Sequence, residues 1–232
     1  MKNLPFTLID LTHALHENIP TWEGDCGFKH DRAQDYDPHS IWKFRTHTIM
    51  MNEGIGTHID APAHCIPGGK FIHELPLDDL IAPCVVLDVS HKADENYCVT
   101  AADVYEFEKL HGEIKAGTFV IVRTGWDRFW STPEKYRNNL KFPYLAEDTA
   151  QLLVEKEIVG LGIDTLSPDQ PLLGYPVHQI ILGANKYIVE NIANADQLPA
   201  VGSYSMAIPM KIQQGTEAPI RLMGMLLRSP VS

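Results

Sequence analysis

Residues 51–70, MNEGIGTHIDAPAHCIPGGK, carry His58, Asp60 and His64 within seven positions. Four glycines and two prolines in the same stretch argue against a continuous helix. Residues two apart in an extended chain point to the same side, so the side chains of His58 and Asp60 are predicted to project together. Pro62 favours an extended residue before it, and the chain can then turn and bring His64 back towards the same point.

This pattern indicates a metal site. An imidazole, a carboxylate and a second imidazole that converge on a rigid loop suit a divalent ion such as zinc or manganese. The structural alternative is a histidine that merely pairs with a nearby aspartate in a loop. The third polar residue, His64, and the glycines and prolines around it favour the metal site.

Composition limits the classes of function. The chain has 232 residues, of which 44% are hydrophobic and 21% charged, as is usual for a globular protein, and we expect one domain over residues 1–232. The formal net charge of −11 argues against nucleic-acid and anionic-membrane partners. No apolar run is long enough to span a membrane, and the first residues lack the apolar core of a signal peptide. Four cysteines without a C-x-x-C motif are expected to be free thiols in a cytoplasmic protein.

Hydrophobic patterns predict more strands than helices. A loop-rich stretch is expected up to about residue 40. Helices are predicted between Thr100, as N-cap, and Gly112, and over 146–158. Strands are predicted over 6–12, 41–51, 83–89, 117–126, 159–164, and around 204–211 and 220–227. This order predicts an α/β fold with a mixed, barrel-like β-sheet flanked by a few helices, of the swivelling β/β/α kind.

A second cluster of candidate ligands lies in PVHQIILGANKYIVEN, residues 176–191. Pro176 suits the first position of a helix and places His178 in the first turn, where the helix dipole favours a neutral imidazole that can bind metal. Glu190 would lie about 18 Å away if the whole stretch were helical. A break near Asn185 would let the two side chains meet. From this stretch alone, a core-lining helix with an incidental histidine is the favoured interpretation.

Two further stretches have open interpretations. GIDTLSPD, residues 162–169, follows a strand and could place polar groups at a ligand site, although ordinary turn chemistry is favoured for Ser167 and Asp169. Trp22, in the loop IPTWEGD over 19–25, could stack on a substrate ring or fill a gap between the loop and the core. No serine-hydrolase elbow, dinucleotide fingerprint or P-loop is present.

Several of these pieces occur together in a known family. GTHIDAPAH (56–64), PTWEGD (20–25), RTGW (123–126), GIDTLSPD (162–169) and HQIILGANKYIVENIAN (178–194) make the chain resemble the metal-dependent hydrolases of the putative cyclase family, which includes bacterial kynurenine formamidase and isatin hydrolase. The resemblance implies that His58 and Asp60 bind metal and that His64 transfers a proton.

The same resemblance assigns His178 and Glu190 to a second metal position and places Trp22 in the substrate pocket. It implies a metal-activated water that attacks a small amide, formamide or cyclic amide, which makes the protein a hydrolase of C–N bonds other than peptide bonds. It also implies a homo-oligomer, either a dimer or a tetramer.

One departure affects the metal site. The family signature, H-x-G-T-H-x-D-x-P-x-H, has a ligand histidine four residues before His58, and this chain has Gly54 there. Glu53 or a water could fill the position, or one site could be lost, so we expect one or two zinc or manganese ions. The alternative function is a metal-free module that binds a small molecule without catalysis.

Overall fold

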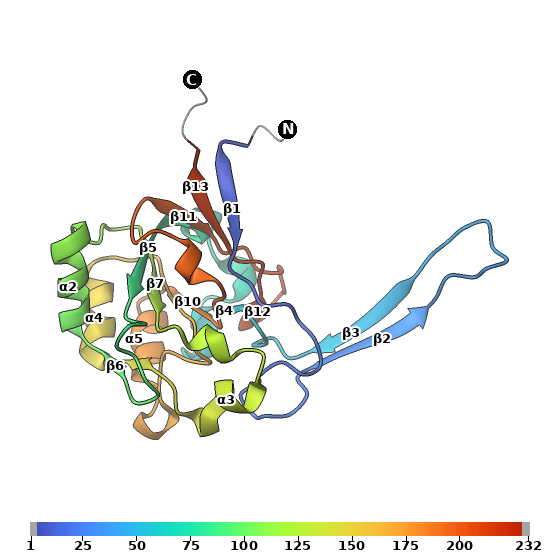
Figure 1. The fold of residues 1–232 in the computed structure, drawn as a ribbon, viewed down its shortest axis with the longest axis horizontal. Coiled ribbons are helices and arrows are strands. Elements are labelled where there is room, and N and C mark those ends of the chain that lie inside the picture. Colours follow the sequence, from blue (N-terminus) through green and yellow to red (C-terminus); the bar gives the residue numbers. More distant parts are fainter. Residues whose placement is uncertain (1–3, 229–232) are drawn as a thin grey trace.

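Nine strands form one curled, mixed sheet in the computed structural model, which describes residues 4–228 (Figure 1). The strands lie in the order β1 (Phe6–Asp10), β13 (Met223–Leu227), β11 (Ser203–Met206), β5 (Ile81–Asp88), β7 (Phe119–Arg123), β9 (Gly160–Ile163), β10 (Tyr187–Glu190), β4 (His58–Asp60) and β12 (Glu217–Pro219). The predicted fold class is confirmed. The sheet joins strands from both ends of the chain.

The centre of the sheet is covered on both faces. β5, β7, β9 and β10 run parallel to one another, and the outer strands pair antiparallel. The helices α2 (Ala101–His111), α4 (Glu147–Glu155) and α5 (Pro176–Gly183) pack over one face (Figure 1). Loops and the outer strands close the other face over a second apolar cluster. Burial on both sides explains why the run in β7, FVIVR, is apolar almost throughout.

Local signals in the sequence placed most elements correctly. α2 begins after Thr100, whose backbone N–H donates to Asp103 at 2.7 Å as in a capping box. α5 begins at Pro176 and ends at Gly183, and the chain is extended again from Tyr187, as the predicted break requires. No helix within residues 4–228 is long and apolar enough to cross a membrane.

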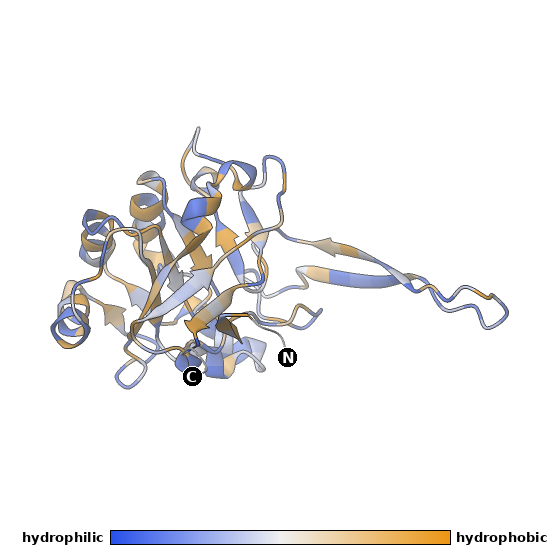
Figure 2. Ribbon diagram, turned by 90° about the horizontal axis from the view of Figure 1, so that it is seen from above, coloured by the Kyte–Doolittle hydropathy of each residue, from blue (hydrophilic) through white to orange (hydrophobic). Residues whose placement is uncertain are grey.

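The loop-rich prediction up to residue 40 was wrong in one respect. β2 (Phe28–Gln34) pairs antiparallel with β3 (Thr46–Met51) in a separate two-stranded sheet. This hairpin projects from the body as a long arm (Figures 1 and 2). The sequence FKHDRAQ gave no strand signal because only its first residue is buried and the others are mostly charged or polar.

Short elements complete the chain. They are α1 (Leu77–Leu80), α3 (Pro133–Arg137), the pair β6 (Cys98–Val99) and β8 (Tyr144–Leu145), and single turns of 3-10 helix at Pro62–His64, Ile72–Glu74, Trp126–Phe129, Asn138–Leu140, Pro171–Leu173 and Ala195–Gln197.

Candidate metal centre

Three neighbouring strands place four polar side chains on one face of the sheet. β4 lies between β10 and β12, with Glu190 opposite His58 and Glu217 opposite Asp60. Residues directly opposite each other share a face, and so do residues two apart on one strand. All four side chains therefore point to the same side. The sequence predicted a shared face only for the two residues on β4, His58 and Asp60.

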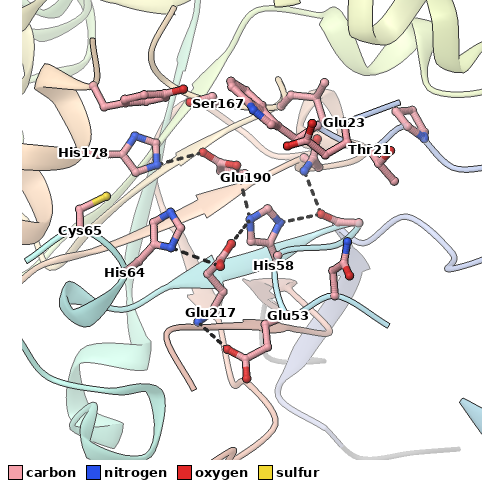
Figure 3. A pocket seen from close by; sticks show the side chains of 18 residues that line it. Thr21, Glu23, Glu53, His58, His64, Cys65, Ser167, His178, Glu190 and Glu217 are labelled. Carbon is pink, nitrogen blue, oxygen red and sulfur yellow. Dashed lines mark hydrogen bonds and ion pairs between the residues drawn. The ribbon is translucent and has the colours of Figure 1, made fainter. Parts of the chain in front are cut away.

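Two histidines reach this face from outside the three strands. His178 comes from the first turn of α5, and its Nε2 lies 3.4 Å from Glu190 Oε1 and 3.6 Å from Asp60 Oδ2. His64 ends the turn of 3-10 helix that follows β4, as the proline in this turn suggested. The imidazole rings of His64 and His178 lie 5.8 Å apart, centroid to centroid (Figure 3).

The ring of His58 is held in one orientation. Its Nδ1 lies 2.9 Å from the Gly56 carbonyl oxygen, which can only accept, so Nδ1 carries the proton. The Asn191 side-chain amide donates to the same carbonyl at 2.9 Å, and Thr57 donates to the Asn191 carbonyl at 2.6 Å. These contacts leave His58 Nε2 directed at the carboxylates, 3.3 Å from Asp60 Oδ1.

Three carboxylate oxygens at the centre lack hydrogen-bond partners among the described residues. Asp60 is 1% exposed, and neither of its oxygens has a hydrogen-bond partner among the described residues; the same holds for Glu190 Oε1. Unpartnered buried carboxylates are costly unless a cation balances them. Two overlapping sets of ligand atoms lie within 4.8 Å of one another, His58–Asp60–Glu217 and Asp60–His178–Glu190. The donor set therefore fits a divalent metal, with Asp60 common to both sets.

The pKa shifts of the buried groups also fit a site for a cation. Burial alone would lower the pKa of His58, but the surrounding carboxylates, Asp60 first, raise it to about 10. Burial also opposes protonation of His178, yet neighbouring carboxylates raise its pKa well above the ordinary value. Burial and then the charge of Asp60 raise the pKa of Glu190. The carboxylates therefore favour positive charge at this centre, and a bound metal would supply that charge in place of these protons.

Glu217 also contacts the candidate proton-transfer residue. Its Oε2 lies 3.2 Å from His64 Nδ1, and its Oε1 lies 3.8 Å from His58 Nε2. The hydrogen bond to Glu217 raises the pKa of His64, although partial burial opposes it. His64 is half-buried, with its side chain 32% exposed. It is the most accessible of the three histidines at the centre.

The centre borders a cavity of about 420 Å³, a volume suited to a small ligand. Trp22 and Tyr175 line it, and their ring centroids lie 6.3 Å apart. Trp22 also packs edge-on against Phe142, and Arg137 Nε donates to the Trp22 carbonyl at 2.8 Å. The two roles considered for Trp22 are therefore compatible, since one ring both packs against the core and lines the cavity.

The sequence did not reveal Glu217 or the role of Asp169. Glu217 lies far along the chain from β4, in a strand too short to show a pattern, and only the pairing of the strands places it here. Asp169 was assigned to turn chemistry, but it is buried and accepts a hydrogen bond from His178 Nδ1 at 2.7 Å. Its position before the helix that carries His178 was the available signal.

Glu53, one candidate to replace the missing family histidine, has a different task. Its Oε2 accepts hydrogen bonds from the backbone N–H groups of Thr216, at 3.0 Å, and Glu217, at 3.4 Å. It belongs to neither set of candidate ligands. Glu53 therefore anchors the start of β12 and does not point into the metal centre.

Comparison with known proteins agrees with this geometry. The model of the family described as putative cyclase matches residues 9–170. The chain belongs to the putative cyclase family. An isatin hydrolase from Roseibium aggregatum is 31% identical, with 94% of this chain and 91% of that protein covered. A kynurenine formamidase from Paracidovorax citrulli is 25% identical, with 97% and 98% covered.

Solved structures of the family have the same fold. An isatin hydrolase bound to the product analogue thioisatinate superposes on this chain with a TM-score of 0.88 at 29% identity, covering 97% of this chain and 94% of that one. Isatin hydrolase A from Labrenzia aggregata, bound to benzyl benzoate, has a TM-score of 0.86 at 30% identity, with 97% and 95% covered. The predicted family is confirmed, and the predicted class, a hydrolase of C–N bonds other than peptide bonds, agrees with these relatives.

Proposed function

We propose that this protein is a metal-dependent hydrolase of a small amide, formamide or cyclic amide. The observation that carries the proposal is the buried pair of carboxylates, Asp60 and Glu190, whose unpartnered oxygens lie beside two imidazole Nε2 atoms at the edge of a cavity. Relatives named isatin hydrolase and kynurenine formamidase support a flat aromatic substrate. The metal-free binding module receives no support from this arrangement, because such a module needs no buried unpartnered carboxylates.

Four predicted residues would hold the metal: His58, Asp60, His178 and Glu190. A bound divalent ion supplies polarisation of the substrate carbonyl and a lower pKa for the attacking water. Nitrogen and oxygen ligands of this kind suit zinc and manganese. The two overlapping sets allow one or two ions.

The chain's own residues would deliver the proton and hold the substrate. Hydrolysis adds water to the carbonyl carbon, breaks the C–N bond and requires a proton on the leaving nitrogen. His64 borders the cavity and is held by Glu217, so it can deliver that proton. Trp22 would hold a planar substrate by ring contact.

We also propose a cytoplasmic homo-oligomer, without nucleic-acid or membrane partners. All four cysteines are free thiols, which supports a reducing compartment. The net charge of −11 supports the absence of polyanionic partners. Exposed apolar side chains on the arm formed by β2 and β3 support self-association.

The decisive experiment compares metal content and hydrolysis in one set of samples. Protein loaded with zinc or manganese is assayed on isatin, on the formamide of kynurenine and on simple aryl amides, with Asp60→Asn beside it and Asp78→Asn on the exposed surface as control. We expect turnover of at least one substrate, and loss of metal and turnover in Asp60→Asn only. Full metal content in Asp60→Asn would overturn the ligand assignment, and binding of substrate without metal or turnover would favour the binding module.

A further inference from the structure

The space in front of Gly54 is already filled by another residue. A β-carbon built on Gly54 would overlap Oε1 of Glu217 and would lie 2.9 Å from its Cδ. The same β-carbon would lie 3.4 Å from His58 Nε2, the atom that faces the candidate metal. A side chain at position 54 and the Glu217 carboxylate would therefore occupy the same space.

The backbone around Glu217 is firmly held. β12 pairs with β4, with Glu217 opposite Asp60, and the Ala61 N–H donates to the Thr216 carbonyl at 2.9 Å. Glu53 accepts from the N–H groups at the start of β12. Figure 3 shows the Glu217 side chain rising from this strand between the rings of His58 and His64. Its position is thus set by the sheet.

The Glu217 carboxylate faces the candidate metal centre, as a histidine at position 54 would. One oxygen points to His58 at 3.8 Å and the other to His64 at 3.2 Å. Ligand atoms of His58, Asp60 and Glu217 lie within 4.8 Å of one another, as close as those of the second set. The Glu217 side chain is 22% exposed, so it is largely removed from water.

We propose that Glu217 replaces the side chain that Gly54 lacks, so that this chain holds two metal ions, one by His58, Asp60 and Glu217 and the other by Asp60, His178 and Glu190. Glycine at position 54 and glutamate at 217 then form a compensating pair, because each requires the other. Both ions share Asp60, and each receives one imidazole nitrogen and two carboxylates, a set well suited to manganese. This inference rests on the metal-dependent function proposed above and adds Glu217 to it as the fifth ligand residue.

A simpler role for Glu217 must be distinguished from this one. As a positioning residue alone, it would hold the His64 ring through Oε2 and bind no metal. Both roles predict slower turnover when Glu217 is changed. Only the ligand role predicts a change in the number of bound ions, so the test counts ions.

The experiment uses the full chain, stripped of metal and titrated with manganese or zinc. Ions per chain and their affinities are measured by calorimetry and elemental analysis for the parent, Glu217→Gln, Glu217→Ala and the double variant Gly54→His/Glu217→Ala. Glu23→Gln is the matched control, since this carboxylate lines the same cavity but belongs to neither ligand set. Circular dichroism confirms that each variant is folded.

We expect two ions in the parent and the control. In Glu217→Gln and Glu217→Ala one ion should be lost or weakened by at least about 100-fold, since even residues that only support a ligand contribute about 10- to 100-fold. The double variant, in which a histidine enters the space that Glu217 leaves, should bind two ions again. This rescue would show that the two positions exchange one ligand.

Two unchanged ions in Glu217→Gln and Glu217→Ala would overturn the inference and leave Glu217 as a positioning residue. One ion in the parent, unaffected by these variants, would also overturn it while leaving the proposed hydrolase intact, because Asp60, His178 and Glu190 would still hold that ion. A parent that binds no ion at all would overturn the proposed function as well.

Discussion

One carboxylate, Asp169, both caps the first N–H groups of helix α5 and orients the histidine in its first turn. Asp169 Oδ2 lies 2.7 Å from the His178 ring Nδ1 and accepts the His178 backbone N–H at 2.9 Å, and Oδ1 accepts the Val177 N–H at 2.9 Å. The two backbone contacts satisfy free N–H groups near the start of the helix. The ring contact leaves Nε2 of His178 facing Asp60 and Glu190.

Asp169→Asn should therefore weaken metal binding without removing a ligand. An asparagine has one accepting oxygen where three donors need two, so either the helix start or the His178 ring loses its partner. We expect the metal affinity to fall by about 10- to 100-fold, measured by competition with a chelating indicator. Asp78→Asn, an exposed acid on α1, is the control. An affinity equal to that of the parent would show that Asp169 serves only the helix.

His64→Ala should separate binding from turnover. His64 is in neither set of candidate ligands, so the variant should keep the metal content of the parent. The loss of a proton donor should lower kcat by about 10²- to 10⁴-fold. Elemental analysis and steady-state kinetics on the same sample give both numbers. Full turnover would remove the proton-transfer role, and a loss of metal would make His64 a ligand.

The sequence predicted four of the five candidate metal ligands because the relationships among them are local. His58 and Asp60 are two apart on β4, and the break before β10 allows His178 and Glu190 to approach each other. Both relationships follow from the strand and helix periods, which relate residues close together in the sequence.

The fifth candidate ligand, Glu217, depends on contacts between distant segments. Glu217 is placed by the pairing of β12 with β4, which no local pattern reveals. From the sequence, Gly54 indicated only that a ligand histidine was missing. The residue that fills its space, Glu217, is remote in sequence. Strand β2 of the arm was missed because its residues after Phe28 are mostly charged or polar and show no apolar alternation.

Gly160→Ala should destabilise the fold. Gly160 lies beside Tyr187 on the neighbouring strand, and an added β-carbon would meet the Tyr187 ring at 2.5 Å. That ring is 2% exposed and stacks on Phe119 at 5.5 Å between centroids, so it has little room to move. We expect a loss of about 1–3 kcal/mol in the free energy of unfolding, by denaturant titration.

The matched control for this variant is Gly183→Ala. Gly183 lies at the end of α5, where an added β-carbon would meet only Ile66 Cδ1 at 3.7 Å. Alanine is favoured over glycine in helices by roughly 0.5–1 kcal/mol, so this variant should be neutral or slightly stabilised. Equal losses in both variants would show that the Tyr187 contact is not the cause.

The arm should control self-association. Ile41, Trp42 and Phe44, between β2 and β3, are 87%, 68% and 59% exposed. Because exposed apolar clusters favour association, we expect the parent to be a homo-oligomer and Trp42→Ser/Phe44→Ser to shift towards the monomer in light scattering. Leu110→Ser, which changes a 76% exposed leucine on α2, should leave the mass unchanged. An oligomer insensitive to the arm variant would place the interface elsewhere.

His13 should make stability depend on pH. Its ring stacks on Trp130 at 3.9 Å between centroids, and within residues 4–228 its Nε2 has no hydrogen-bond partner. Burial lowers the pKa of His13 from 6.5 to about 4. As the pH falls through this range the unfolded chain takes up a proton that the folded chain refuses, so stability is full above about 6.5 and declines towards pH 4.

His13→Phe keeps an aromatic ring against Trp130 and removes the titrating group. The free energy of unfolding of the parent should fall by up to about 3 kcal/mol more than that of the variant between pH 6.5 and 4, since each tenfold change in a proton equilibrium is worth about 1.4 kcal/mol. Urea titrations across this range measure the difference. His91→Phe, at an exposed position, should follow the parent curve. Parallel curves for the parent and His13→Phe would show that the folded chain accepts a charged ring beside Trp130.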